Sequence, residues 1–228
     1  MPLLRTAALL LLLISLGVRP LFAGWGQDSG AAAAKNDGGT QPAKGLSGAE
    51  AVHGFLSDSA GPYSIFMALA TAGVHQASDN PPDWRQGFPA LSARFGSNMG
   101  ITGVGNAVRY GVGWSMGADF RFRKCQCASF RPRLRHAVAN TVIARRPNGR
   151  AVLSLPNLIA PYAATTSAVY AWYPARYGMQ DALRMGNYNL LGTLAGNIVF
   201  EFLPVKATNF LRRMHLGGSR VSTPPEKP

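Results

Sequence analysis

Apolar residues recur at helical spacing along most of the chain. From residue 61 to residue 78 they fall three or four positions apart, and Pro81 and Pro82 then end the pattern. The most regular pattern runs from 182 to 202 and is closed by Pro204. These segments predict an all-α fold, a compact bundle of five to seven helices with glycine-rich helix contacts. Helices are expected over residues 61–78, 84–97, 101–117, 133–144, 154–172 and 182–202.

The segment 141–155 has two interpretations. Ser154 followed by Pro156 is typical of a helix start, with a capping residue and a proline in the first turn. Alternatively, the turn residues 147–149 between two β-prone runs predict a β-hairpin. We favour the helix start, because an uncharged run follows Pro156.

Glycines repeat inside the expected helices at intervals of three or four residues. Each glycine costs about 1 kcal/mol in a helix relative to alanine, so its repeated use predicts close contact between helix backbones. We expect Gly103, Gly113, Gly192 and Gly196 at helix crossings with little exposed surface. The interior of a soluble bundle and packing in or on a membrane explain this pattern equally well.

The chain begins with the pattern of a secretory signal. Arg5 supplies a positive charge, an apolar run covers residues 7–16, and Ala23 is a small residue at the expected cleavage point. This run is shorter than the ~20 apolar residues that a membrane span needs. We therefore expect residues 1–23 to be a signal peptide and the protein to be exported, to the periplasm or the outer-membrane periphery of a bacterial cell.

Composition divides the rest of the chain. Residues 24–47 are mostly small and polar, which is typical of a flexible linker, and residues 48–216 are apolar and aromatic enough to form one helical domain. Residues 217–228 are expected to be a disordered tail. Residues 152–173 are long enough to cross a membrane, but prolines interrupt them and the basic flank 118–150 would lie on the outer side, against the usual tendency. A domain that lies against a membrane is the better interpretation.

The chain has 23 Lys and Arg against 10 Asp and Glu, a formal net charge of +13. Much of this charge lies between residues 118 and 150, where Asp119 is the one acidic residue. We expect the segment 121–150, with Phe120, Phe122 and Phe130, to form a solvent-facing patch that docks on anionic lipid or glycolipid. A solvated face that keeps the protein soluble is the alternative. The patch residues are Arg121, Arg123, Lys124, Arg131, Arg133 and Arg135.

Arg109 and Glu201 are each the one strongly ionised residue in the core of an expected helix. Glu201 ends a polar stripe at four-residue spacing, which is either the wet side of the helix or a face turned to the bundle interior. In the second case the carboxylate needs a partner, since an unpaired buried charge is costly. We predict a buried ion pair between Arg109 and Glu201.

The two cysteines, Cys125 and Cys127, are separated by one residue. So short a loop strains a disulfide, and a zinc site needs four ligands that the chain does not offer at metal spacing. We expect two incidental thiols, with a redox or intermolecular role as the alternative. The sequence gives no metal site and no cofactor.

No Ser/His/Asp elbow, phosphate-binding loop or metal-binding helix is recognisable in the sequence. An enzyme is therefore unsupported. The second hypothesis is a membrane-surface enzyme that acts on a lipid or cell-wall precursor, with His136, Arg135 and Glu201 as its catalytic set. Nucleic acid is not an expected partner, because an exported chain meets little of it.

Several short motifs have a familiar form, among them Gly61-Pro-Tyr-Ser64, Pro81-Pro-Asp-Trp-Arg-Gln-Gly87 and Trp172-Tyr-Pro174. Together they resemble a group of uncharacterised exported bacterial envelope proteins over residues 48–204. The resemblance implies an envelope location and no particular activity. The first hypothesis is therefore an exported, membrane-associated helical protein with a structural or interaction role in the cell envelope, with an anionic surface or another envelope protein as its partner.

Overall fold

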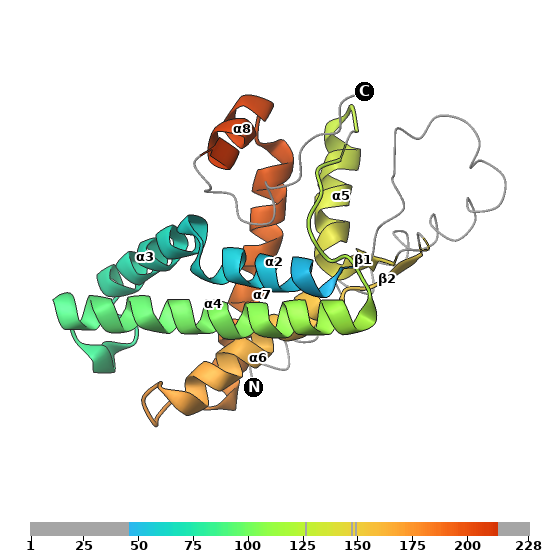
Figure 1. Ribbon diagram of the computed structural model, residues 1–228. Helices are drawn as coiled ribbons and strands as arrows, with labels where there is room; N and C mark the ends of the chain where they lie inside the picture. Colours follow the sequence, from blue (N-terminus) through green and yellow to red (C-terminus); the bar gives the residue numbers. More distant parts are fainter. Residues whose placement is uncertain (1–45, 126, 147, 149, 214–228) are drawn as a thin grey trace, which may run out of the picture. The chain divides into compact units, whose positions relative to one another are not determined.

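The computed structural model describes residues 46–125, 127–146, 148 and 150–213. The expected signal peptide, nearly all of the expected linker and the expected tail lie outside these residues. The described part is all-α, as the sequence predicts (Figure 1). Its elements are α2 (Gly48–Ala60), α3 (Pro62–Ala77), the 3-10 helix η1 (Pro82–Trp84), α4 (Phe88–Met116), α5 (Phe130–Val142), β1 (Ile143–Arg145), β2 (Ala151–Leu153), α6 (Leu155–Ala171), α7 (Met179–Phe202) and α8 (Val205–Arg213).

The long helix α4 organises the bundle. It contacts α2, α3 and α6, while α7 contacts α6 and α5 (Figure 1). The sequence predicted two helices here, over 84–97 and 101–117, and this prediction was wrong. Residues 98–100 between the two segments are also helical, so the segments form one helix. Pro89 is tolerated because it lies in the first turn of α4, where its missing N–H has no helical partner to lose.

Helix α2 was not among the expected helices, although the sequence carries its start signal. Ser47 and Glu50 form a capping box, in which the Ser47 hydroxyl accepts from the Glu50 N–H at 3.2 Å. In return the Ser47 N–H donates to the Glu50 carboxylate at 2.9 Å. The first residues of the domain are thus tied to a defined position, and Leu46 before them is buried.

Both interpretations of residues 141–155 are partly correct, because the segment contains a β-hairpin and the start of a helix. β1 and β2 form a short antiparallel hairpin with Ala144 opposite Val152, and α6 begins directly after it with Ser154 at the N-cap and Pro156 in the first turn. The helix then runs through Pro161 without ending. None of the helices within the described residues combines the length and the apolar character that a membrane span requires.

The bundle is packed largely through alanine and glycine. A Cβ added at Gly105 of α4 would lie 3.4 Å from the Ala164 Cβ of α6, and one at Gly186 of α7 would lie 2.5 Å from the Tyr162 ring of α6. Small residues therefore allow the close helix contacts that the glycine pattern predicts. Buried alanines are frequent in this core: Ala51, Ala68, Ala72, Ala90, Ala137, Ala160, Ala164, Ala168 and Ala182.

The prediction of which glycines lie at helix crossings was only partly right. Gly113 is buried against the Phe120 ring, which enters the space that a side chain would fill. Gly103 and Gly192 face open space, so the prediction was wrong for both. Gly196 is half-buried. Spacing within one helix cannot determine which face meets a neighbour, because that depends on where the other helices pack.

Candidate functional site

Helix α3 presents large apolar side chains to the solvent. Phe66, Leu69 and Val74 are 61, 53 and 65% exposed, and Ile65 and Met67 are exposed beside them. We call these five residues the α3 apolar face. The helix contains no Asp, Glu, Lys or Arg. It is therefore an exposed helix without the charged side chains that usually cover the outer face of a surface helix.

The inward face of α3 carries small side chains. Ser64, Ala68 and Ala72 recur at four-residue spacing and are buried, and α3 packs on α4. The size order is thus the reverse of the usual one, with small residues inside and large apolar residues outside. Contiguous exposed apolar surface of this kind marks a contact with another molecule or with a membrane. The apolar periodicity predicted the helix but not which of its faces is exposed, although the run of 16 residues without Asp, Glu, Lys or Arg is visible in the sequence.

The basic segment 121–150 directs much of its charge inward. The Asp119 carboxylate, whose side chain is 4% exposed, accepts from Arg121 Nε at 3.0 Å and from Arg123 Nη2 at 2.8 Å. Burial acts to raise the pKa of Asp119, but the hydrogen bonds and charge of Arg121, with the charge of Arg123, offset this and hold the pKa below its ordinary value. The first two patch residues are therefore parts of an internal ion-pair cluster.

Glu201 lies near the end of α7 and is fully buried. Its carboxylate accepts from the Cys125 N–H at 3.0 Å and from Arg133 Nε at 3.2 Å. Arg133 also donates to the Glu201 carbonyl oxygen, and its guanidinium lies 4.8 Å from the Phe202 ring centre. Arg133 therefore ties α5 to the end of α7 through the carboxylate, the carbonyl and the ring.

The predicted ion pair between Arg109 and Glu201 was wrong. Arg109 Nη2 instead lies 3.2 Å from the Asp58 carboxylate, which also accepts from the Tyr110 hydroxyl at 2.7 Å. Each residue did need a partner of opposite charge, but α4 meets α2 and α7 meets α5, so the partners come from those helices. Asp58 was not among the predicted partners because it lies in α2, a helix that was not expected from the sequence.

His136 approaches the same carboxylate. Its Nδ1 lies 3.4 Å from Glu201 Oε2, and its Nε2 lies 3.0 Å from the Asn140 amide nitrogen. Burial lowers the pKa of His136, which outweighs the raising effect of the Glu201 carboxylate. Of the hypothetical catalytic set, His136 and Glu201 thus come together, while Arg135 is exposed on the neighbouring position of α5.

Only part of the predicted basic patch faces the solvent. Arg121, Arg123 and Arg133 bind internal carboxylates, and Lys124 donates to the Leu203 carbonyl oxygen and to the Thr208 hydroxyl. The expectation of a wholly solvent-facing patch was therefore wrong for Arg121, Lys124 and Arg133, which are only partly exposed, whereas Arg123 is exposed and still binds Asp119. The exposed cations of the region are Arg123, Arg131, Arg135, Arg145, Arg146 and Arg150.

The aromatic residues of this region divide in the same way. Phe120 and Phe122 are buried in the core, whereas Phe130 is 63% exposed beside Arg131. The expected aromatic contribution to a membrane contact thus reduces to Phe130.

Cys125 and Cys127 are joined by a disulfide, so the prediction of two free thiols was wrong. Their Cα atoms lie 5.2 Å apart, within the range that a disulfide bridges. Cys125 also donates its N–H to Glu201, so the backbone of Cys125 lies next to the buried carboxylate.

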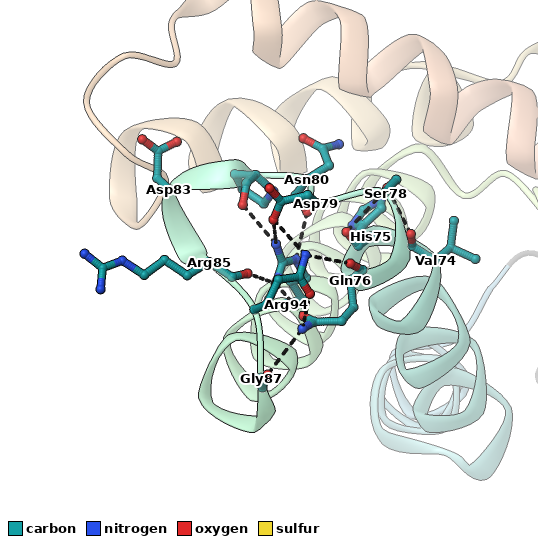
Figure 2. A network of polar contacts seen from close by, with 12 residues as sticks. Val74, His75, Gln76, Ser78, Asp79, Asn80, Asp83, Arg85, Gly87 and Arg94 are labelled. Atoms are coloured by element: carbon teal, nitrogen blue, oxygen red, sulfur yellow. Dashed lines mark hydrogen bonds and ion pairs between the residues drawn. The ribbon is translucent and has the colours of Figure 1, made fainter.

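Arg94 is the centre of a second polar network (Figure 2). This arginine of α4 has no exposed surface, and its guanidinium binds the connection between α3 and α4. It donates to carbonyl oxygens at 2.9–3.0 Å and to the Gln76 side chain, and it lies 3.6 Å from the Asp79 carboxylate. The carbonyl oxygens belong to Asn80, Pro81 and Arg85.

The backbone of this connection adopts conformations that need such support. Asp79 and Arg85 have φ angles of 48° and 60°, a region that side chains with a Cβ rarely occupy. Backbone strain of this kind costs on the order of 1–3 kcal/mol per residue and persists where the surroundings determine it. Arg94 supplies those surroundings, and sequence spacing gave no sign of its role.

A cleft of about 570 Å³ lies next to this connection. Its lining comes from α3, Asn80, α4, the connection between α6 and α7, and α7. Tyrosine rings and side-chain amides are prominent in the lining, which includes Tyr173, Tyr177, Tyr188, Asn98 and Asn189. Within the described residues, no group of three or more His, Cys, Asp or Glu side chains could hold a metal ion.

Comparison with known proteins finds no relative of this chain. No protein-family model matches the chain, and no curated protein or solved structure is significantly similar to it.

Proposed function

We propose that this chain is an exported, membrane-associated helical protein with a structural or interaction role in the cell envelope. The observation that carries the proposal is the α3 apolar face. A signal sequence, expected over residues 1–23, supports export to the periplasm or the outer-membrane periphery.

The geometry of α3 suits a helix that lies in a membrane interface. Its 16 residues correspond to a length of about 24 Å. An interfacial helix buries its apolar side in the boundary between head groups and acyl chains, and normally turns a polar side to water. Here the other side of the helix packs on α4 through Ala68 and Ala72, so the protein body takes the place of the polar side.

The exposed large side chains provide the driving force. Full burial of a Leu, Ile or Phe side chain stabilises by about 1.5–3 kcal/mol, so several partly exposed ones give measurable membrane affinity. Cations that remain exposed, among them Arg131, Arg146 and Arg150, add attraction to anionic lipid or glycolipid of about 1 kcal/mol for each one near the surface. An envelope protein that covers the same face is the competing partner, and the experiment below distinguishes the two.

Co-sedimentation of the full chain with vesicles tests the proposal. The double variant Phe66→Ser/Leu69→Ser should bind vesicles of phosphatidylglycerol and phosphatidylcholine more weakly than the unchanged chain. The matched control is Leu191→Ser/Val199→Ser, which alters two comparably exposed apolar residues of α7 and should retain binding. Equal loss in both variants, or no loss in either, would contradict the role of α3 and favour a protein partner.

A salt series tests the electrostatic part. Binding should weaken as salt rises to physiological concentration, because exposed charges are screened over about 8 Å there. The variant Arg131→Gln/Arg146→Gln/Arg150→Gln should reduce this salt dependence. The control Arg133→Lys keeps the charge of a side chain that binds Glu201, and it should leave the salt dependence unchanged.

The enzyme hypothesis has weaker support. His136 and Glu201 do approach each other, which a catalytic pair requires. Yet the Glu201 side chain has no exposed surface, and its oxygens already accept from Cys125 and Arg133. A group that must touch a substrate needs access to it, so a role in joining α5 to α7 explains these contacts better.

A further inference from the structure

The cleft beside the connection between α3 and α4 has the size of a small-molecule site. Its volume of about 570 Å³ falls within the range of about 300–1,000 Å³ that such sites occupy. It draws its lining from segments far apart in the sequence, from Met67 in α3, which also belongs to the α3 apolar face, to Asn189 in α7. The cleft thus exists only in the folded domain.

One wall of the cleft is held rigid. Asn80 belongs to the lining, and its carbonyl oxygen accepts from Arg94 Nε at 2.9 Å (Figure 2). Asp79, which precedes Asn80, and Arg85, later in the same connection, have positive φ angles of 48° and 60°. A fully buried arginine that supports strained backbone is costly, and strain of this kind clusters at ligand sites, where it fixes a wall before the ligand arrives.

A second part of the lining, from the connection between α6 and α7, is fixed by aromatic contacts. Tyr173 lies 5.1 Å from the Trp84 ring of η1 and 5.4 Å from the Tyr177 ring, measured between ring centres. Arg176 next to them binds Asp83 at 2.8 Å. These contacts join the connection between α6 and α7 to the connection between α3 and α4, so both parts of the lining keep one relative position.

The lining carries little charge. Among the described residues that line the cleft, none is Asp or Glu, and Arg184 is the one with a permanent charge. Arg184 lies 2.7 Å from Asp181, and its side chain is 60% exposed. Burial, followed by the charge of Arg94, lowers the pKa of His75, and burial raises the pKa of Tyr173, so both are neutral near pH 7. A charged ligand would lose its hydration here without a counter-charge to replace it.

From this combination of tyrosine rings, amides and low charge we infer that the cleft binds an uncharged saccharide. The apolar C–H face of a sugar ring packs on an aromatic ring, and Tyr173, Tyr177 and Tyr188 offer three. The hydroxyl groups of a sugar both donate and accept, as do the side-chain amides of Asn189 and Asn98, although Asn98 already donates one N–H to the Ala68 carbonyl oxygen at 3.2 Å. Apolar walls with a few polar groups that set orientation are typical of small-molecule sites.

This site goes beyond the proposed membrane contact and does not depend on it. The probes are the uncharged oligosaccharides chitotetraose and cellotetraose, titrated into the full chain in an isothermal calorimeter. At least one should bind saturably at one site. Tyr177→Ala and Asn189→Ala should each weaken that binding by about tenfold or more, whereas Tyr170→Ala, on the exposed side of α6 and outside the lining, should not change it.

Circular dichroism confirms that each variant is folded before the comparison is made. The variant Phe66→Ser/Leu69→Ser should retain saccharide binding, which separates this site from the α3 apolar face. Absence of saturable binding with both oligosaccharides would overturn the inference. Equal affinity of the unchanged chain and both cleft variants would overturn it as well.

Discussion

Helix α3 and the basic segment 121–150 place apolar and charged side chains in opposite ways. The helix has no Asp, Glu, Lys or Arg, and it exposes Phe66 and Leu69 while it buries Ala68. The basic segment is rich in arginine, yet Arg121 and Arg133 point to the buried carboxylates of Asp119 and Glu201. Apolar surface is thus turned outward in one region, and charge is turned inward in the other.

This difference shows that a side chain's chemistry does not fix its location. A buried carboxylate is tolerated when cations and N–H groups satisfy it, as they do for Glu201. Exposed apolar side chains are tolerated singly, whereas five on one helix are the basis of the membrane contact proposed for α3. The basic segment, in contrast, joins α5 to α7 through Arg133 and Glu201.

The largest expected effect concerns the buried ion pair between Glu201 and Arg133. Glu201→Gln should lower the free energy of unfolding by about 3–5 kcal/mol, because it removes one partner of a buried ion pair and leaves Arg133 uncompensated. Urea denaturation followed by circular dichroism measures the change. Asp83→Asn is the control, since its pair with Arg176 is exposed and screened by solvent and should contribute little. Similar losses in both variants would remove the distinction between buried and exposed pairs.

The second effect concerns Asp119, which binds two arginines of the basic segment. Asp119→Asn should destabilise the domain by about 1–3 kcal/mol, because Arg121 and Arg123 would lose their hydrogen bonds to a charged carboxylate. The same denaturation experiment applies. Since the pKa of Asp119 is held below its ordinary value, its stabilising contribution should be present above pH 4 and disappear as the pH falls through the lowered pKa. A variant as stable as the unchanged chain would mean that Arg121 and Arg123 act as solvated surface charges.

A third effect follows from His136. Its pKa in the folded state lies below the ordinary value of 6.5, so the unfolded chain binds more protons near that pH. Stability should therefore fall as the pH drops from about 7 toward 5, with a slope from this residue of at most ~1.4 kcal/mol per pH unit. In His136→Gln the slope should be smaller. An unchanged slope would mean that His136 is as hydrated as in the unfolded chain.

The smallest expected effect concerns the α3 apolar face. Phe66→Ser should change the free energy of unfolding by no more than about 0.5 kcal/mol, because the ring is largely exposed. Ala72→Leu on the inward side of the same helix should cost about 1–3 kcal/mol through overpacking against α4. The two variants are compared by thermal or urea denaturation. A large loss in Phe66→Ser would show that this face is covered within the protein.

The all-α fold was largely determined by local sequence signals. Periodicity located α3, α6 and α7, and Ser154 with Pro156 located the start of α6. The capping box of Ser47 and Glu50 was also present in the sequence, although it was not used. Signals of this kind act over a few residues, so they can be recognised without knowing where other segments lie.

Only the tertiary structure decided which residues meet. Arg109 pairs with Asp58 and Glu201 with Arg133, because α4 packs on α2 and α5 packs on α7. The outward direction of the α3 apolar face and the walls of the cleft were set in the same way. Helical spacing defines the faces of each helix, but the choice of face that meets a neighbour depends on the packing of all helices together, which no local pattern encodes.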